Sequence, residues 1–417
     1  MNKLKVIGKL KIINELSAKF STELSTIPIT KPNSKPINPC FSSGPCAKIP
    51  NYSLSNLSTD TLGRSHRSET VLREIRHLLN EIRKLLSIPS DFLIGTFPGS
   101  DTGALESTFW NLLGPKTVDI FCWGTFGKHW VNDIKNELKL KTNEYIADGY
   151  QLPDLTKYNP NNDTVFVLNG TTTGVWLPNL DWISNVRSGL TFCDATSGIF
   201  YDKLDWDKLD ILTFSWQKAL GGEAGHGIIV FSPRAIKRIE EYTPQWPIPK
   251  IFRFKKGRTI NPLLFDGHFI NTPSVLCIKD FIHCLEWANQ IGGIAGIKTR
   301  VDRNMDVITR YVKQYEWLHF LVVNEECRSK TSVCLNLDID NKKLFEMIEY
   351  MEKEKIGYDI KSYRDVTPGL RIWSGPTVES SDINILMRWI VWYVETNILD
   401  IKNIKDIGQV ETIENIE

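Results

Sequence analysis

The sequence has no apolar run that approaches the roughly 20 residues needed to span a bilayer, so we expect a soluble protein. It also lacks a strong charge of one sign: its 417 residues carry a formal net charge of +1. That balance excludes a general attraction to nucleic acid or to an anionic membrane. Its eight cysteines form no CxxC pair, which predicts reduced core cysteines and no metal site. We expect a large core and small-molecule partners.

Residues 1–35 differ in composition from the rest of the chain. They are basic and rich in serine and threonine, with only Glu15 and Glu23 as acidic residues, and they end among prolines. Such a segment is similar to an organelle transit peptide, although it lacks the arginines that these peptides favour. A disordered extension is the alternative. We predict a cytoplasmic protein, with a mitochondrial or other organelle matrix as the alternative location.

Two short apolar runs, residues 190–193 and 211–214, each lead to an ionic side chain, Asp194 after the first and Lys218 after the second. If the runs are neighbouring parallel strands, both side chains open on the carboxyl edge of the sheet, where open α/β sheets bind ligands. Pyridoxal phosphate needs this pair, because a lysine holds its aldehyde as a Schiff base and a carboxylate keeps its ring nitrogen protonated. A glycine-rich hairpin with a surface lysine is the alternative, but it leaves the aspartate unexplained.

Turns of small residues follow other predicted strands. Residues 95–106 run from such a turn into a helix, so their N–H and hydroxyl groups could bind a phosphate. An N-cap by Asp101 is the alternative. Residues 124–127 are expected to form a turn that places Phe126 or Trp123 to stack on a flat ring. Either aromatic ring could instead belong to the core.

A hydroxyl-rich turn at residues 169–174 could bond a phenolic oxygen. Ser68 is a candidate N-cap of a helix, which leaves His66 and Arg67 just ahead of a helix start, where anions are favoured. Arg67 could therefore bind a substrate oxyanion, and a solvated arginine is the alternative. Repeated polar turns at strand ends predict an α/β fold with an open, mostly parallel sheet and one ligand cleft.

Seven short motifs, in order along residues 38–400, together resemble those of the phosphoserine aminotransferase family, in the branch found in some archaea and alphaproteobacteria. They are FSSGP (41–45), SHRS (65–68), SDTG (100–103), NGTT (169–172), DATS (194–197), SWQK (215–218) and NTPS (271–274). The resemblance implies a fold-type I, class V transferase that depends on pyridoxal phosphate. We expect an N-terminal extension (1–35), a large α/β cofactor-binding domain (36–285), a small C-terminal α+β domain (286–405) and a polar tail (406–417).

The activity that the resemblance implies is reversible transfer of an amino group between L-glutamate and 3-phosphohydroxypyruvate. The products are O-phospho-L-serine, a precursor of L-serine, and 2-oxoglutarate. Members of the family also handle 4-phosphohydroxy-L-threonine in pyridoxal phosphate biosynthesis. The alternatives are an alanine-glyoxylate aminotransferase, a cysteine desulfurase, or a protein that binds the cofactor without turnover.

The resemblance also implies residue roles. Lys218 and Asp194 match the catalytic lysine and the partner of the ring nitrogen. The cofactor-binding positions are Asp101, Thr102, Phe126, Thr172, Asp194, Gln217, Lys218, Asn271 and Thr272, of which the last two reach the site of the other subunit in a homodimer. The substrate-binding positions are His66, Arg67, Arg364 and Arg371. The chain departs from its relatives at Glu223-Ala224, in the lysine loop, and at Ile49, where a basic residue is usual.

Overall fold

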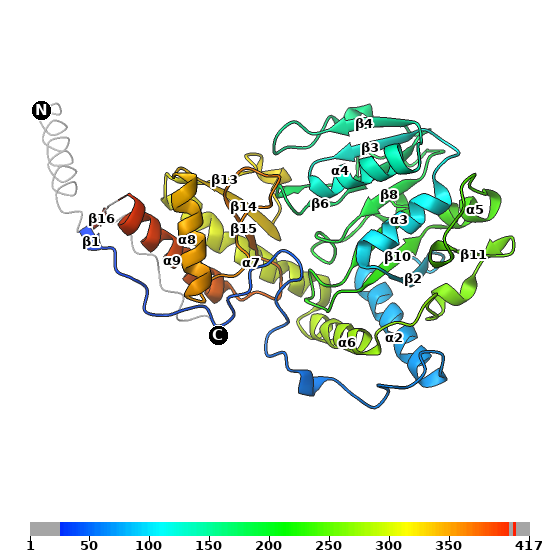
Figure 1. Ribbon diagram of the computed structural model, residues 1–417, viewed down its shortest axis with the longest axis horizontal. Helices are drawn as coiled ribbons and strands as arrows, with labels where there is room; N and C mark the ends of the chain where they lie inside the picture. Colours follow the sequence, from blue (N-terminus) through cyan, green and yellow to red (C-terminus); the bar gives the residue numbers. More distant parts are fainter. Residues whose placement is uncertain (1–25, 400–402, 406–417) are drawn as a thin grey trace, which may run out of the picture. The chain divides into compact units, whose positions relative to one another are not determined.

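The computed structural model describes residues 26–399 and 403–405. The chain divides into two compact units, and the larger one is Lys35–Leu386. This unit contains a seven-stranded sheet and a three-stranded sheet (Figure 1).

The seven-stranded sheet confirms the predicted α/β architecture. Its strand order is β2-β10-β9-β8-β5-β3-β4, and every neighbouring pair is parallel except those that β10 makes with β2 and β9. The strands are β2 (Leu93–Pro98), β3 (Val118–Cys122), β4 (Thr142–Ile146), β5 (Asp163–Val167), β8 (Thr191–Asp194), β9 (Ile211–Ser215) and β10 (His226–Phe231).

The central strands are apolar runs because both faces of the sheet are covered. Every residue of β3, β5, β8, β9 and β10 is buried, as expected for strands between two helical layers. The predicted pairing of the two runs beside Asp194 and Lys218 is confirmed, since β8 and β9 are parallel neighbours with Asp194 opposite Thr213.

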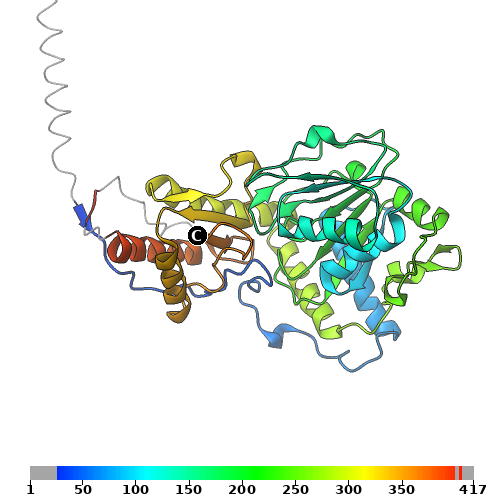
Figure 2. The same ribbon diagram turned by 45° about the horizontal axis from the view of Figure 1, so that its top comes forward.

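Six described helices precede or follow these strands in the chain, and the last of them, α7, contacts β13 (Leu318–Phe320). They are α2 (Glu69–Leu86), α3 (Ser100–Leu112), α4 (Thr125–Asn132), α5 (Pro233–Glu241), α6 (Val275–Gln290) and α7 (Gly293–Gln314). Figure 2 shows α3 and α4, in cyan, lying across one face of the sheet, and α3 packs on β9 and β10 while α2 packs on α6. Ser68 occupies the N-cap position of α2, as predicted, although its side chain makes no capping hydrogen bond.

The three-stranded sheet is antiparallel, with β13 (Leu318–Phe320), β14 (Ser332–Leu337) and β15 (Leu370–Trp373) in that order. The neighbouring helices in the chain are α8 (Asn341–Lys353) and α9 (Ser380–Tyr393). Two short ribbons, β6 (Asn169–Gly170) with β7 (Val175–Trp176) and β11 (Lys255–Lys256) with β12 (Thr259–Ile260), complete the sheets of this unit. The division into domains at residue 285 stays a prediction.

The smaller unit combines segments from both ends of the chain. In its described part, β1 (Thr26–Pro28) pairs antiparallel with β16 (Asn403–Lys405), and the indole Nε1 of Trp389 donates to Ser34 O at 2.8 Å. The predictions of a targeting segment and of a polar tail fall mainly on residues 1–25 and 406–417, which lie outside the described residues. None of the described helices combines the length and apolar character that a membrane crossing requires.

Candidate active site

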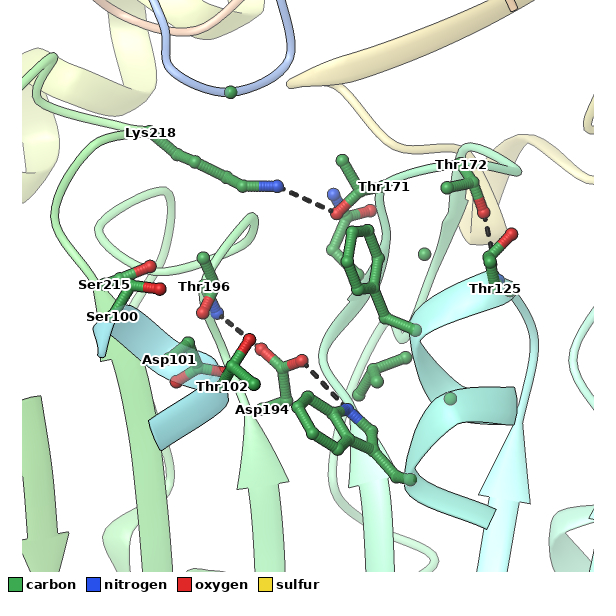
Figure 3. Close-up of a pocket in the computed structure, with 18 of the residues that line it drawn as sticks. Ser100, Asp101, Thr102, Thr125, Thr171, Thr172, Asp194, Thr196, Ser215 and Lys218 are labelled. Atoms are coloured by element: carbon green, nitrogen blue, oxygen red, sulfur yellow. Dashed lines mark hydrogen bonds between the residues drawn. The ribbon is translucent and has the colours of Figure 1, made fainter. Parts of the chain in front are cut away.

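A cavity of about 210 Å³ lies at the carboxyl edge of the seven-stranded sheet. It is lined by the turns that follow the strands and by the first residues of α3 and α4, as the topology predicts for a ligand site. Figure 3 shows Lys218 and Asp194 approaching this space from opposite sides. The sequence prediction that the two side chains open onto one cleft is therefore met by the geometry.

Lys218 lies in the loop between β9 and β10 and is 7% exposed. Its Nζ donates to Thr171 Oγ1 at 3.3 Å and lies 5.6 Å from the centre of the Phe126 ring. Burial lowers the pKa of Lys218, although the nearby Cys46 and Asp194 oppose that shift, so more of the nucleophilic neutral amine is present than for a surface lysine. Gly44 passes over the lysine with φ +145°, and a Cβ there would stand 3.0 Å from Lys218 Cε.

Asp194 is the last residue of β8 and is 9% exposed. Its Oδ1 accepts a hydrogen bond from Thr196 N at 3.0 Å, and its Oδ2 accepts one from Trp130 Nε1 at 3.2 Å. These two donors fix the orientation of the carboxylate at the cavity wall. Sequence reasoning missed Trp130, because one turn of α4 separates it from the strand end and nothing in the local letters distinguishes it from a core tryptophan.

The start of α3 forms another wall of the cavity. Its N-cap is Gly99, which needs φ +85°, and Ser100, Asp101 and Thr102 line the cavity. The alternative that Asp101 caps the helix is wrong, because Asp101 lies inside the first turn and makes no cap. Its two carboxyl oxygens are buried, and their polar neighbours are the Asp194 carboxylate and the hydroxyls of Thr196 and Thr213. Burial, and then the charge of Asp194, raise the pKa of Asp101 well above its usual value.

Of the two aromatic candidates, Phe126 lines the cavity and Trp123 does not, being buried in the core. Residues 124–127, expected as a turn, instead start α4 at Thr125. The predicted turn is wrong, because small residues at a helix start give the same sequence pattern as a turn.

Two neighbouring threonines of the hydroxyl-rich turn make different contacts. Thr172 Oγ1 accepts from Thr125 N at 3.1 Å, which ties the turn to the start of α4. Thr171, which the sequence analysis did not single out, contacts Lys218 and donates to Ser197 Oγ at 2.7 Å. Both threonines line the cavity. Three consecutive threonines give no sequence signal that separates these roles.

Gln217 lines the cavity beside Lys218, and its Oε1 is buried without a partner in the described structure. Buried polar atoms of this kind are satisfied in proteins by a ligand or water. The same is true of Thr196 Oγ1 and Ser215 Oγ, which also belong to cavity residues.

Six of the predicted residues are not part of the cavity wall within one chain. They are His66, which is buried, Arg371, which is half-buried, and four exposed residues, Arg67, Asn271, Thr272 and Arg364. The pKa of His66 is lowered by burial and then by Arg67 and His268.

Arg371 takes an intermediate position. It lies on β15 opposite Cys334, and its Nε is buried with no hydrogen-bond partner in the described chain. Its charge acts on Lys218 and contributes to the lowered pKa of that amine. Burial in turn lowers the pKa of Arg371 itself. A half-buried guanidinium whose Nε has no hydrogen-bond partner is placed to receive an anionic group.

Residues 137–358 match the model of the aminotransferase class-V family. Over 87% of its length the chain is 49% identical to the phosphoserine aminotransferase of Methanosarcina mazei, of which the match covers 98%. The chain belongs to the class-V aminotransferases, in the phosphoserine aminotransferase family. It is therefore an enzyme, a transaminase.

Solved structures of this family share the fold. A phosphoserine aminotransferase studied for radiation damage of its Schiff base is 18% identical, with a TM-score of 0.74, over 86% of this chain and 99% of that one. The phosphoserine aminotransferase of Trichomonas vaginalis, described as bound to PLP, is also 18% identical, with a TM-score of 0.72, over 85% of this chain and 99% of that one. At this identity the likeness shows the fold-type I architecture alone.

Proposed function

We propose that this transaminase binds pyridoxal 5'-phosphate in the cavity and transfers the amino group of L-glutamate to 3-phosphohydroxypyruvate. The products are 2-oxoglutarate and O-phospho-L-serine, and the reaction is reversible. The observation that carries the proposal is the placement of Lys218 and Asp194 on opposite sides of one cavity. The 49% identity to the enzyme of Methanosarcina mazei supports the choice of substrates.

The residues present fit this cofactor. Lys218 would hold the aldehyde, Asp194 the ring nitrogen, and Phe126 one face of the ring. The start of α3, with the free N–H groups of a helix terminus and the Thr102 hydroxyl, would hold the phosphate. The unpartnered polar atoms of Gln217, Thr196 and Ser215 supply further hydrogen-bonding capacity along the wall. Of the two threonines, Thr171 has the hydroxyl next to Lys218 and is the better candidate for the phenolic oxygen.

The bound cofactor supplies an electron-accepting ring that stabilises negative charge at the substrate Cα. Lys218 would hold and move the proton at Cα, a role that its lowered pKa favours. Asp194, oriented by Trp130 and Thr196, keeps the ring nitrogen protonated. Arg371 would bind the α-carboxylate of each substrate.

A cysteine desulfurase reaction is not supported by the thiol nearest to the lysine. Cys46 is buried, and burial raises the pKa of its thiol despite the opposing charge of Lys218. A desulfurase needs a reactive thiolate on an accessible loop.

We further propose that the active enzyme is a homodimer in which Asn271 and Thr272 reach the cofactor of the other subunit. Both are exposed and outside the cavity of their own chain. Large exposed apolar side chains occur on the neighbouring segments, at Leu263 and Leu276, as is common where a subunit interface forms. His66, Arg67 and Arg364 are proposed to bind the substrate phosphate, and the exposed side chains of Arg67 and Arg364 are free to reach it.

Mixing two inactive variants tests the shared site. One chain carries Lys218→Ala and the other Asn271→Ala with Thr272→Ala. After the two are unfolded and refolded together, a mixed dimer contains one intact site, so an equal mixture should regain about one quarter of wild-type activity. No recovery, with mixed dimers shown to form, would contradict a shared site.

The function itself is tested by following the visible absorbance of the bound cofactor. Adding L-glutamate should bleach the band, and adding 3-phosphohydroxypyruvate should restore it. Glyoxylate is the control acceptor. Recovery with glyoxylate and not with 3-phosphohydroxypyruvate would overturn the substrate assignment, and no bleaching would overturn the transaminase reaction. The location of the protein, cytoplasm or organelle matrix, stays a prediction that rests on residues 1–35.

A further inference from the structure

Asp101 is a buried acid in a place where an ionised carboxylate is costly. Its side chain lies in the cavity wall beside Asp194 (Figure 3). Both of its oxygens are inaccessible to solvent, and their polar neighbours are the Asp194 carboxylate and the hydroxyls of Thr196 and Thr213. A buried carboxylate next to a second carboxylate is strongly disfavoured, so such a group tends to be neutral.

The charge of Asp194 acts on Asp101 in the same direction as burial. Asp194 stands next to it on β8, and the two carboxyls together with burial also raise the pKa of the Cys193 thiol. The start of α3 is where the cofactor phosphate is proposed to bind, which would add further negative charge. Two ionised carboxylates and a phosphate at one small cavity would repel one another.

Other titratable groups on the packed elements do not offset this. The charge of Lys218 acts on both Asp101 and Asp194. Its amine is proposed to hold the cofactor aldehyde, so it would not form an ion pair with Asp101. On β10, His226 accepts from Ser274 N at 3.4 Å, and burial lowers its pKa to about 4. On α5, Arg238 pairs with Asp163 at 2.9 Å. Lys250, beyond α5, is exposed.

We propose that Asp101 is a positioning residue that carries a proton and donates it in a hydrogen bond to the Asp194 carboxylate. Asp194 is then held by three donors, the others being Trp130 Nε1 and Thr196 N, and its negative charge is kept for the ring nitrogen of the cofactor. This inference rests on the proposed cofactor site. It gives Asp101, which the resemblance counts among the cofactor-binding positions, a role that acts on the cofactor through Asp194.

The variants Asp101→Asn and Asp101→Ala test whether Asp101 acts as a neutral hydrogen-bond donor or as an ionised carboxylate. The asparagine amide can donate to Asp194 as a protonated carboxyl does, whereas alanine cannot. We expect Asp101→Asn to keep the cofactor dissociation constant within about threefold of wild type, and Asp101→Ala to raise it about tenfold or more, since a hydrogen bond to a charged group is lost. If Asp101→Asn weakens binding as much as Asp101→Ala does, the acid works in its ionised form and the proposal is wrong.

Thermal unfolding of the full-length protein gives a readout independent of turnover. A carboxyl with a raised pKa binds a proton in the folded state that the unfolded state has released, so its stabilising contribution is complete below the unfolded pKa and falls as pH rises toward the folded one. Asparagine does not titrate, so Asp101→Asn should not lose this stability as the pH rises. The Tm of Asp101→Asn should rise relative to the wild-type Tm between about pH 5 and about pH 8. Over that range the unfolding constant of the wild type, divided by that of Asp101→Asn, should increase up to tenfold per pH unit.

Asp91→Asn is the control, because Asp91 is exposed in the turn before β2, and its Tm should stay parallel to wild type. Infrared spectra near neutral pH should show a protonated-carboxyl band that Asp101→Asn lacks. Parallel Tm curves for wild type and Asp101→Asn, with no difference band, would overturn the inference. These outcomes concern Asp101 alone, whereas failure of the proposed function would appear as unbleached absorbance in the wild type.

Discussion

The cofactor side and the substrate side of the proposed site differ in how much of each one chain assembles. On the cofactor side, one cavity is lined by Lys218, Asp194 and Phe126. The side chains of Lys218 and Asp194 make hydrogen bonds to Thr171 and Trp130. On the substrate side, Arg67 and Arg364 are exposed and lie outside that cavity, and Arg371 alone of the proposed arginines acts on Lys218.

The two sides are therefore positioned by different parts of the fold. The cofactor residues sit on turns directly after buried strands, so the sheet itself brings them together. The substrate residues sit on long loops and on a second, smaller sheet, so their position depends on packing between parts of the fold or on a second chain.

The largest effect is expected for Lys218→Ala on the cofactor side. The variant loses both the group that holds the cofactor aldehyde and the base that moves the Cα proton, so activity should fall at least about a thousandfold. Borohydride treatment of the wild type should fix the cofactor to the peptide that contains Lys218, and this label should be absent from the variant. Lys203→Ala, at an exposed lysine, serves as the control. Wild-type turnover by Lys218→Ala would contradict the whole assignment.

Asp194→Ala should lower kcat about a hundredfold, because the ring nitrogen loses the carboxylate that keeps it protonated. The defect should be largest at high pH, where an unpaired ring nitrogen releases its proton most readily. Asp148→Ala removes an exposed carboxylate and should leave the pH profile of kcat unchanged. An Asp194→Ala variant with the wild-type kcat would show that the cofactor side is not organised as described.

On the substrate side, Arg371→Met and Arg364→Met form a matched pair. Loss of Arg371 should raise the KM of both L-glutamate and 3-phosphohydroxypyruvate about tenfold or more, because both carry an α-carboxylate. Loss of Arg364 should raise the KM of the phosphorylated substrate alone. If Arg364→Met impairs glutamate as strongly as Arg371→Met does, the two arginines do not divide the substrate groups between them.

The smallest effect is expected for Trp130→Phe. The phenylalanine fills most of the space but cannot donate to Asp194, so kcat should fall about three- to tenfold through looser orientation of the carboxylate. Trp123→Phe is the matched control, since Trp123 Nε1 is buried without a partner in the described structure and so has no such bond to lose. Equal effects of the two substitutions would indicate a packing defect rather than a lost hydrogen bond.

Sequence patterns located the strands and turns well for a physical reason. Buried strands such as β8 and β9 are short apolar runs, and the residue that follows each run is necessarily at the sheet edge. Patterns failed where neighbouring letters are chemically equivalent, as for Thr171 and Thr172, or where a turn and a helix start share the same small residues, as at residues 124–127.

The amino-acid sequence by itself determined the α/β alternation, the edge of the sheet that carries the chemistry, and the lysine and aspartate at that edge, because these follow from local hydrophobic periodicity. The tertiary structure alone decided which ring lines the cavity, which threonine meets the lysine, and that Trp130 and Asp101 stand beside Asp194. Those contacts join residues far apart in the chain, and their geometry depends on how helices pack on the sheet.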